Sequence, residues 1–351
     1  VFNLDTALRM MGDVAEFYVD NEVRNHYFVS ISGYHIAEAG ANPISQAALT
    51  LSNGLTYVEL FNSRGLDANK FLRNFSWFFS NGMDPEYAVI GRVCRRIWAI
   101  AMRDMYGVDD RSQKLKYHIQ SSGRSLHAQE YTWNDYRTTL QALYALADNA
   151  NSLHTNSRDE AFGTPTEDTV RDAVAIQLIL SKEYGWLQNE NPLQGSHVAE
   201  WLTDSVEEEI LKIFEEMHRR GGVLGALEVN YQRNRIQDES MIYEHRKHSG
   251  ELPIIGVNTF EEGVDNSLSV EEFNIEVTRS DKEERMMVIE RNREFKKSHS
   301  KEAEEGLARL KQVAREGGNL FEVMMDIVEY CTVGQVTQAL FETGGKFRRN
   351  M

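Results

Sequence analysis

The sequence predicts an α/β fold with parallel strands. Between residues 28 and 183, a short apolar or aromatic stretch is followed by a polar loop and a helical stretch four times in succession. Strands separated by helices pair in parallel through right-handed crossovers. The pattern is typical of half of a (β/α)8 barrel or of an open doubly wound sheet.

The elements can be placed in order from their apolar periodicity. A helix over Leu4–Val23 opens the chain, and the first strand contains Phe28, Val29 and Ile31 and ends at Tyr34. The next strands are predicted at Phe71–Phe79, Leu115–Ser121 and Ala150–Thr155. The helices that follow the four strands are predicted over Pro43–Arg64, Glu86–Tyr106, Trp133–Ala147 and Glu167–Glu183.

The second half of the chain is mainly helical. Helical patterns cover Ser196–Arg219, Ala226–His248, Ser280–Arg315, Leu320–Cys331 and Val333–Phe341, and a short strand is expected at Pro253–Val257. We therefore expect a half barrel over residues 1–195, a helical segment with a closing strand over 196–260, and an acidic connector with a helical extension over 261–351. The apolar stripe of the last helices is typical of packing or of a subunit interface, so this extension is expected to serve in oligomerisation or docking.

Composition excludes several classes of protein. The 351 residues carry 54 acidic and 38 basic side chains, a formal charge of −16, which argues against nucleic-acid binding driven by phosphate attraction. Cys94 and Cys331 are too few for a disulfide framework or a cysteine zinc site, and they fit a reducing cytoplasm. With no apolar run of about 18 residues and no signal peptide, we expect a soluble protein. Because the chain begins with Val1 in a helical pattern, we expect a fragment of a longer polypeptide.

Polar residues gather at or just beyond the predicted strands. They are Tyr34 and His35, Asn74 and Ser76, His118 and Gln120, and His154, Asn156 and Glu160. If the four strands are parallel neighbours, these residues meet at one rim, where the catalytic groups of barrels collect. A lone histidine such as His35 is more often a satisfied structural residue, so the prediction depends on this convergence.

The rim lacks the signatures of common chemistries. There is no His-Glu-x-x-His, Gly-x-Ser-x-Gly or Gly-Lys-Ser/Thr motif, and no carboxylate pair at one strand end. Neutral donors and acceptors suit a carbonyl group and a sugar-bearing cofactor. The spacing of Asn156 and Glu160 suits a ribose diol on one helical turn, but a carboxylate favoured by a helix dipole explains it equally well. A barrel hydrolase with a metal on His35, His118 and His154 stays an alternative.

Three long motifs resemble a known family. They are Ser30–Ala41 (SISGYHIAEAGA), Tyr117–Gln129 (YHIQSSGRSLHAQ) and Ser152–Glu160 (SLHTNSRDE). Together with Pro253–Phe260, they are similar to the adenosylcobalamin-dependent acyl-CoA mutases. Within that family, Phe79–Ala88, Gly123–His127 and the terminal stretches Gly334–Phe341 and Lys346–Met351 most resemble the fused isobutyryl-CoA mutases.

The resemblance implies strands five to eight of a (β/α)8 substrate barrel and a helical extension. It implies adenosylcobalamin as cofactor, an acyl-CoA substrate and a radical carbon-skeleton rearrangement, with isobutyryl-CoA and n-butyryl-CoA as the expected pair. Methylmalonyl-CoA or another acyl-CoA stays open. The cobalamin-binding domain and a GTP-binding chaperone domain are expected elsewhere in the polypeptide or complex, and a homodimer is expected. The isolated chain is expected to be inactive, which leaves open a non-catalytic substrate-binding or assembly module.

The resemblance also assigns roles to residues at the rim. His35 is expected to hydrogen-bond the thioester carbonyl, and Tyr34 to line the same pocket. His118 and Gln120 are expected to contact substrate or cofactor. Asn156 and Glu160 are expected to hold the adenosyl ribose. We expect His35, Gln120 and the Asn156–Glu160 pair to open into one shared cavity.

Three further residues are matched to the acyl-CoA chain. Asn74 and Ser76 stand at positions that contact this chain in the family, although Asn74 replaces an arginine of the methylmalonyl enzymes. Arg111 matches a lysine near the CoA phosphates. No residue is predicted as a metal ligand.

Overall fold

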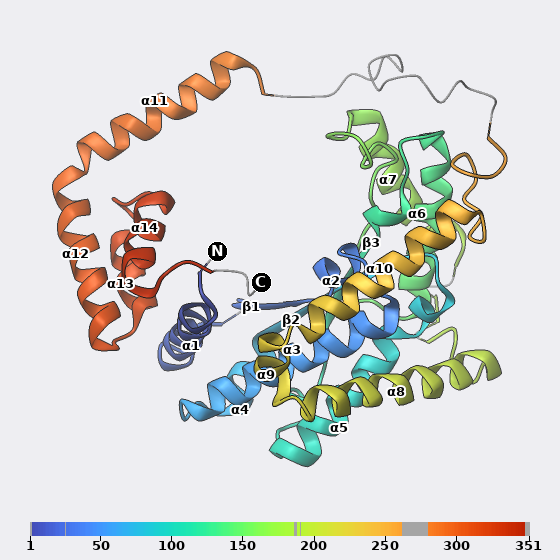
Figure 1. The fold of residues 1–351 in the computed structure, drawn as a ribbon, viewed down its shortest axis with the longest axis horizontal. Helices are drawn as coiled ribbons and strands as arrows, with labels where there is room; N and C mark the ends of the chain where they lie inside the picture. Colours follow the sequence, from blue (N-terminus) through green and yellow to red (C-terminus); the bar gives the residue numbers. More distant parts are fainter. Residues whose placement is uncertain (1, 25, 186–187, 190, 262–279, 348–351) are drawn as a thin grey trace. The chain divides into compact units, whose positions relative to one another are not determined.

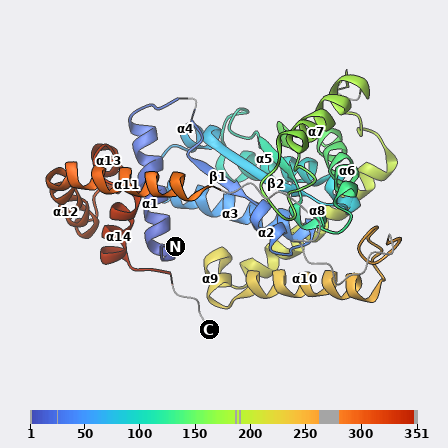
Figure 2. The ribbon, with the colours of Figure 1, turned by 90° about the horizontal axis from the view of Figure 1, so that it is seen from above.

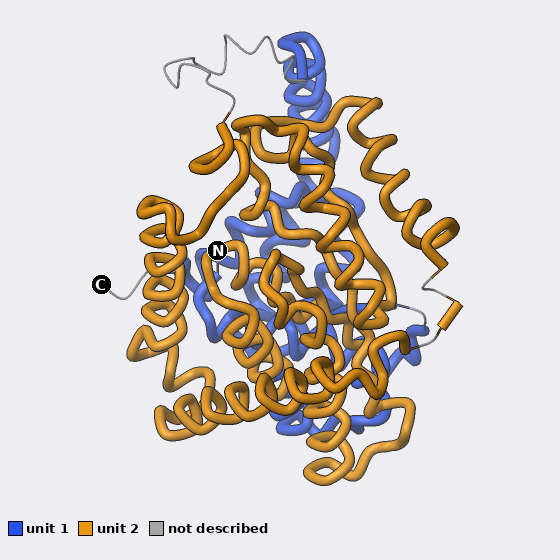
Figure 3. The backbone as a smooth tube through the Cα atoms, turned by 90° about the vertical axis from the view of Figure 1, so that its right-hand side faces the viewer, with its two compact units in different colours: residues 1–29, 57–74, 279–351 blue, residues 30–56, 75–278 orange. Residues whose placement is uncertain are grey.

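The computed structural model describes residues 2–24, 26–185, 188–189, 191–261 and 280–347. The chain divides into two compact units (Figure 3). The first contains residues 1–29, 57–74 and 279–351, and the second contains residues 30–56 and 75–278. The division passes through β1 (Val29–Ser32) and α3 (Pro43–Ser63), so these two elements contribute to both units.

A four-stranded sheet organises the second unit (Figure 1). Its order is β1-β2-β3-β4, with β2 at Phe75–Asn81, β3 at Tyr117–Ser121 and β4 at Ser152–His154. The β2–β3 and β3–β4 pairs are parallel, with Ser80 opposite Gln120 and Gln120 opposite His154. Strands that neighbour in both sequence and space, with helices between them, confirm the predicted α/β architecture.

Helices follow each strand of this unit (Figure 2). The α-helices are α2 (Tyr34–Glu38), α3, α5 (Ile90–Tyr106), α6 (Asn134–Ala147), α7 (Glu167–Leu178), α8 (His197–His218), α9 (Gly222–Glu228) and α10 (Tyr231–Ser249). The short 3₁₀ turns are η2 (Pro85–Ala88), η3 (Gly123–Ser125) and η4 (Tyr131–Trp133), and Ile179–Glu183 continues α7 as a π turn. Pro85 opens η2 after Asp84, as the sequence predicts.

One face of the sheet forms the core of this unit. Side chains that alternate along β2 and β3 are buried there: Phe75, Trp77, Phe79, Tyr117 and Ile119. The Trp77 ring lies 4.7 Å from the ring of Trp98 on α5. A Cβ at Gly54 of α3 would also lie 2.3 Å from the Trp77 ring, so α3 approaches the sheet at a position where no side chain fits.

A buried carboxylate fixes the start of α5. Asp148 accepts hydrogen bonds from the backbone N–H groups of Gly91 (2.5 Å) and Arg92 (2.9 Å), and its backbone carbonyl accepts one from the Tyr117 hydroxyl (2.6 Å). Burial raises the pKa of Asp148 to about 7, although the two N–H groups and Arg95 favour the charged form. The contact ties the start of α5 to the chain that leads into β4.

The first unit is helical. It contains α1 (Leu4–Asp20), α4 (Ala68–Phe71), η1 (Leu72–Asn74), α11 (Lys282–Ser298), α12 (Ser300–Glu316), α13 (Leu320–Ile327) and α14 (Val333–Gly344). Its core includes Leu310, Val323, Ile327 and Leu340. Asp13 of α1 accepts hydrogen bonds from the Leu320 backbone N–H (2.9 Å) and from Arg64 (2.7 Å). The predicted helices near the end of the chain are confirmed, while their role in oligomerisation stays a prediction.

The start of the second strand was predicted wrongly. Phe71 ends α4 and residues 72–74 form η1, so the strand begins at Phe75 rather than at Phe71. Asp67 caps α4 by accepting a hydrogen bond from the Asn69 N–H, and the buried Phe71 ring packs on Phe61 of α3. Asn74 therefore precedes β2, and Ser76 lies near its amino end. The prediction that these two residues stand at the carboxyl end is wrong.

Other differences lie after residue 219. The strand predicted at Pro253–Val257 is a turn with a single bridge between Ile255 and Thr259, because Asn258 binds the Ile254 N–H and the Leu252 carbonyl. The helix predicted over Ala226–His248 is two helices separated at Asn230, which has a φ of 55°. The helix over Ser280–Arg315 divides at His299. Most of the predicted acidic connector lies outside the described residues.

Candidate active site

The uncovered face of the sheet is lined with polar side chains. By strand alternation and register, this face carries Ser30, Ser32, Ser76, Phe78, Ser80, His118, Gln120, Ser152 and His154. Of these nine side chains, Ser80 belongs to the buried class and the other eight do not, whereas all the alternate residues of β2 and β3 are buried. The chemistry-bearing groups of the sheet therefore lie on the face opposite the helices.

β1 ends at Ser32 rather than at the predicted Tyr34, and Tyr34 and His35 open α2 after its N-cap Gly33, just beyond the carboxyl end of the strand. The Tyr34 ring stacks on Phe78 with centroids 4.8 Å apart and an angle of 4°. Burial raises the pKa of the Tyr34 phenol, and the Glu38 and Glu160 carboxylates raise it further, so the hydroxyl stays a hydrogen-bond donor at neutral pH. His35 is exposed, and its Nδ1 lies 2.8 Å from the Ser32 hydroxyl.

A carboxylate that sequence reasoning missed connects α2 to the ends of two strands. Glu38, the last residue of α2, accepts hydrogen bonds from the hydroxyl groups of Ser80 (2.9 Å) and Ser122 (2.8 Å) through Oε1. Its Oε2 accepts one from the backbone N–H of Arg124 (2.9 Å). A glutamate inside a short helix gives no local signal of such a role, because its partners are 42 to 86 residues away.

Gly123 lies at the centre of this cluster. A Cβ at Gly123 would lie 3.4 Å from Glu38 Oε2, 3.8 Å from Asn156 Nδ2 and 3.9 Å from the Tyr34 hydroxyl oxygen. A carboxylate, an amide and a phenol thus border the space that a side chain at this position would occupy. We call this space the Gly123 recess. It brings together two predicted site residues and one that was not predicted.

Gln120 and Asn156 are joined, as their shared rim predicts. Gln120 Nε2 donates to Asn156 Oδ1 (2.9 Å), and Asn156 Nδ2 donates to the Ser121 carbonyl (2.8 Å). Asn156 is fully buried. Its amide nitrogen carries a second hydrogen beyond the one that Ser121 accepts.

Glu160 follows Asn156 in a turn rather than on the helical turn that its spacing suggested. The Glu160 N–H donates to the Ser157 carbonyl (3.1 Å). Partial burial raises the pKa of the Glu160 carboxyl, Asp159 and Glu38 add to this shift, and His154 opposes it. The Glu160 carboxylate therefore lies in the field of both the Glu38 cluster and His154.

His118 lies further down the open face. Its Nδ1 is 2.8 Å from the Ser152 hydroxyl of β4, and its ring is 5.1 Å from that of Phe78. Burial lowers the pKa of His118, and His154 lowers it further. Among the described residues, neither these two histidines nor His35 belongs to a group of three or more side chains arranged to hold a metal ion.

The residues matched to the acyl-CoA chain lie at the other end of the strands. Asn74 immediately precedes β2, and Ser76 is its second residue. Arg111 is exposed in a turn six residues before β3. The structure thus separates a carboxyl-end group around Tyr34, Gln120 and Asn156 from this amino-end group.

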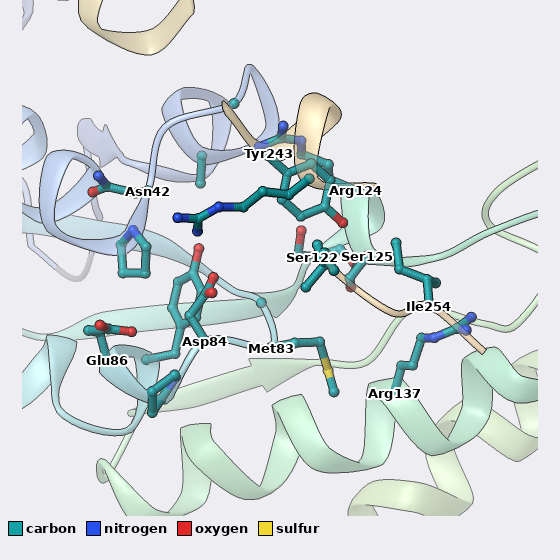
Figure 4. A pocket seen from close by; sticks show the side chains of 18 of the residues that line it. Asn42, Met83, Asp84, Glu86, Ser122, Arg124, Ser125, Arg137, Tyr243 and Ile254 are labelled. Carbon is teal, nitrogen blue, oxygen red and sulfur yellow. Dashed lines mark hydrogen bonds between the residues drawn. The ribbon is translucent and has the colours of Figure 1, made fainter. Parts of the chain in front are cut away.

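A cavity of about 820 Å³ opens beside the Glu38 cluster (Figure 4). Its walls come from the loops after β1, β2 and β3, from α6 and α10, and from the turn at residues 252–255. Arg124 crosses the ring of Tyr243, 4.2 Å from its centroid, in this cavity. The described residues that line it include Ser122 and Arg124 but not His35, Gln120, Asn156 or Glu160, so the expected shared cavity is not this one.

Comparison with known proteins identifies the family. The sequence profile described as methylmalonyl-CoA mutase matches residues 1–346. The chain belongs to the methylmalonyl-CoA mutase family. The match covers most of the residues of both compact units.

The curated relatives agree with this membership. The chain is 60% identical over 352 residues to the fused isobutyryl-CoA mutase of Geobacillus kaustophilus and 59% identical over 351 residues to that of Nocardia farcinica. Each match covers 100% of this chain and 32% of the relative. The chain is 33% identical to the mitochondrial methylmalonyl-CoA mutase of Mus musculus, over 100% of the chain and 46% of that protein. This chain thus spans about a third of the first two relatives.

Within the part of the chain that the structure describes, no helix combines the length and apolar character needed to cross a bilayer.

Proposed function

We propose that this chain is the thioester-binding part of an adenosylcobalamin-dependent acyl-CoA mutase, an isomerase that interconverts isobutyryl-CoA and n-butyryl-CoA. The observation that carries the proposal is an identity of 57–60% along the whole chain with relatives named fused isobutyryl-CoA mutase. Relatives named methylmalonyl-CoA mutase share only 31–33%. The higher identity favours the monoacyl substrate over methylmalonyl-CoA, which is the second candidate together with other acyl-CoA thioesters.

The sheet is proposed to be strands five to eight of a (β/α)8 barrel. Four parallel strands in sequence order fit such a half barrel, and β1 and β4 end the sheet at open edges. The apolar side chains of Val170, Val174 and Leu178, spaced at i, i+4 and i+8 on α7, are 45–52% exposed. Such a stripe is what a helix next to β4 needs if a neighbouring unit of the barrel packs on it.

The open face offers donors for a thioester carbonyl. In the proposed site, His35 and Tyr34 at the carboxyl end donate hydrogen bonds to the carbonyl oxygen, on which negative charge develops during the rearrangement. The raised pKa keeps the Tyr34 hydroxyl protonated for this role. Gln120 and His118 contact the bound groups along the same face.

The CoA chain is proposed to extend toward the opposite end of the sheet. Ser76 lies on the open face at the amino end of β2, and Asn74 precedes it. Arg111 is an exposed cation before β3 and suits a phosphate. In this proposal the acyl group lies near Tyr34 and the phosphates lie near Arg111, at opposite ends of the strands.

The residues at the carboxyl end fit an adenosyl ribose. Glu160 offers a partly exposed carboxylate, and Asn156 retains an amide hydrogen beside the Gly123 recess. A carboxylate that accepts and an amide that donates match the two hydroxyl groups of a ribose. When bound, adenosylcobalamin supplies a carbon radical. The protein's own residues orient the thioester and exclude water.

The remaining parts of the proposal concern partners. We place a cobalamin-binding domain and a GTP-binding chaperone domain in the same polypeptide or complex, because the chain spans only 32% of its fused relatives. We further propose a homodimer and a cytoplasmic enzyme. A non-catalytic assembly module is the alternative for the chain by itself.

Turnover by the complete polypeptide that carries this chain tests the proposal. With adenosylcobalamin, it is expected to convert isobutyryl-CoA into n-butyryl-CoA, measured by chromatography of the released acids. His35→Ala is expected to lower kcat by about 100-fold, because a preorganised donor to the carbonyl is lost. His248→Ala, on an exposed histidine of α10, is the matched control. If the polypeptide converted only methylmalonyl-CoA, the proposed substrate would be wrong and methylmalonyl-CoA would take its place. A folded, cofactor-loaded protein without any turnover would support the assembly module.

A further inference from the structure

We propose that Glu38 is a positioning residue that holds Tyr34 and His35 in register with the ends of β2 and β3. The inference rests on the proposed function, because it deepens the account of the same site. In this proposal Glu38 does not contact the reacting atoms. It fixes the orientation of α2, the helix that carries the two donors Tyr34 and His35.

The hydrogen bonds of Glu38 reach two different strand ends. Ser80 belongs to β2, while Ser122 and Arg124 follow β3. All three partners donate, with distances of 2.8–2.9 Å, and the described bonds give Glu38 no donor role. The two oxygens of a carboxylate have enough lone pairs to accept all three bonds, and bonds to a charged acceptor are stronger than neutral ones. One side chain thus couples α2 to both strands.

The helix α2 has few other means of holding its place. It is five residues long, its N-cap Gly33 makes no side-chain cap, and only Ala37 among its residues is buried. A helix of this length is not stable by itself and depends on tertiary contacts. Besides the local contact of His35 with Ser32, its described long-range anchors are the stack of Tyr34 on Phe78 at one end and the Glu38 bonds one turn later. Loss of the second anchor frees the helix to rotate about the first.

The Gly123 recess shows where this positioning acts. Glu38 Oε2, the Tyr34 hydroxyl and the Asn156 amide all border the place where a side chain at Gly123 would start. Oε2 is held by the Arg124 N–H, which belongs to the same turn as Gly123. The carboxylate therefore fixes both the phenol and the turn that faces it. A shift of about 1 Å in such a donor is enough to cost roughly 100-fold in rate.

Three substitutions of Glu38 separate the effect of its negative charge from the effect of its side-chain length. Glu38→Ala removes all three bonds. Glu38→Gln keeps the length but presents N–H groups to donors, so at least one bond is lost. Glu38→Asp keeps the charge on a shorter arm and is the conservative rescue. Glu208→Gln, on an exposed glutamate of α8, is the matched control.

Kinetics of the complete polypeptide give the first readout. Glu38→Ala is expected to lower kcat for isobutyryl-CoA by about 100-fold with KM changed less than about threefold, because donor alignment matters most in the transition state. Glu38→Asp is expected to recover a part of kcat. A variant that combines Ser80→Ala with Ser122→Ala is expected to reproduce part of the loss and to add little to Glu38→Ala.

Hydrogen exchange gives a second readout that does not need turnover. Amides of residues 34–41 are expected to exchange about 10- to 100-fold faster in Glu38→Ala, the effect of losing a hydrogen bond to a charged group. Faster exchange together with lower kcat supports the proposal. Unchanged exchange overturns it, and so does faster exchange with unchanged kcat. An inactive wild type would refute the proposed function, and the exchange result would still decide whether Glu38 anchors α2.

Discussion

Neighbouring residues of β2 lie in two very different environments. Trp77 and Phe79 are buried under α3 and α5, with exposures of 1% and 0%, while Ser76 and Phe78 face the uncovered side. The same contrast continues in β3, where Tyr117 and Ile119 alternate with His118 and Gln120. The comparison shows that packing and chemistry are divided between the two faces by a period of two residues. Substitutions on one face should therefore change stability, and those on the other should change binding or rate.

The largest expected effect is on the covered face. Trp77→Ala should destabilise the protein by about 3–5 kcal/mol, because it leaves a large cavity against Trp98 and α3. Urea unfolding followed by circular dichroism measures it. Phe78→Ala on the open face is the matched control and should cost about 1–2 kcal/mol, because that ring is half-buried. Equal losses for the two would show that the faces do not differ.

A methyl group added between α3 and the sheet tests the same contrast from the helix side. Gly54→Ala should destabilise by about 1–3 kcal/mol, since its Cβ would meet the rigid Trp77 ring. This clash outweighs the gain of up to about 1 kcal/mol that alanine brings to a helix. Gly334→Ala in α14, with open space at its Cβ, should show only that gain. A stabilised Gly54→Ala variant would contradict the close approach of α3.

The two faces should also respond to pH in opposite directions, beginning with Asp148 on the covered side. Its folded pKa of about 7 lies above the unfolded value near 4, so its contribution is complete at low pH and is lost as pH rises through 7. We expect the free energy of unfolding to fall by about 1 kcal/mol between pH 6 and pH 8 from this group. Asp148→Asn should remove that slope in thermal unfolding at pH 6, 7 and 8. If the pH dependence of the unfolding free energy were unchanged in Asp148→Asn, other titrating groups would be its cause.

The smallest expected effect is that of His118 on the open face. Its folded pKa is lowered, so the neutral ring is favoured and stability is lost as pH falls below about 6.5, where the unfolded histidine takes up a proton. His118→Asn should remove this loss of folding free energy below pH 6.5, which we expect to be less than about 1 kcal/mol. NMR titration of the imidazole should give a midpoint below that of a free histidine. A midpoint above it would mean that a carboxylate, rather than burial, dominates at this site.

The sequence determined the four successive strand and helix units, and it placed Tyr34, Gln120 and Asn156 near the carboxyl ends of their strands. The alternation in Phe75–Phe79 and the run from Val29 to Tyr34 are local signals, because side-chain direction repeats every two residues in a strand. The family motifs then assigned roles to His35, Gln120 and Asn156 that spacing alone could not.

Only the tertiary structure decided the boundaries and the partners. Phe71 lies in a helical turn because its ring packs on Phe61, a contact that no local pattern reveals, and this places Asn74 and Ser76 at the amino end. The role of Glu38 is set by donors from two later segments, and the Gly123 recess exists because three chain segments meet there. The hydrogen bond between Glu38 and Ser122 joins residues 84 positions apart. It depends on the path by which the chain returns to the sheet, and local sequence propensities carry no information on that path.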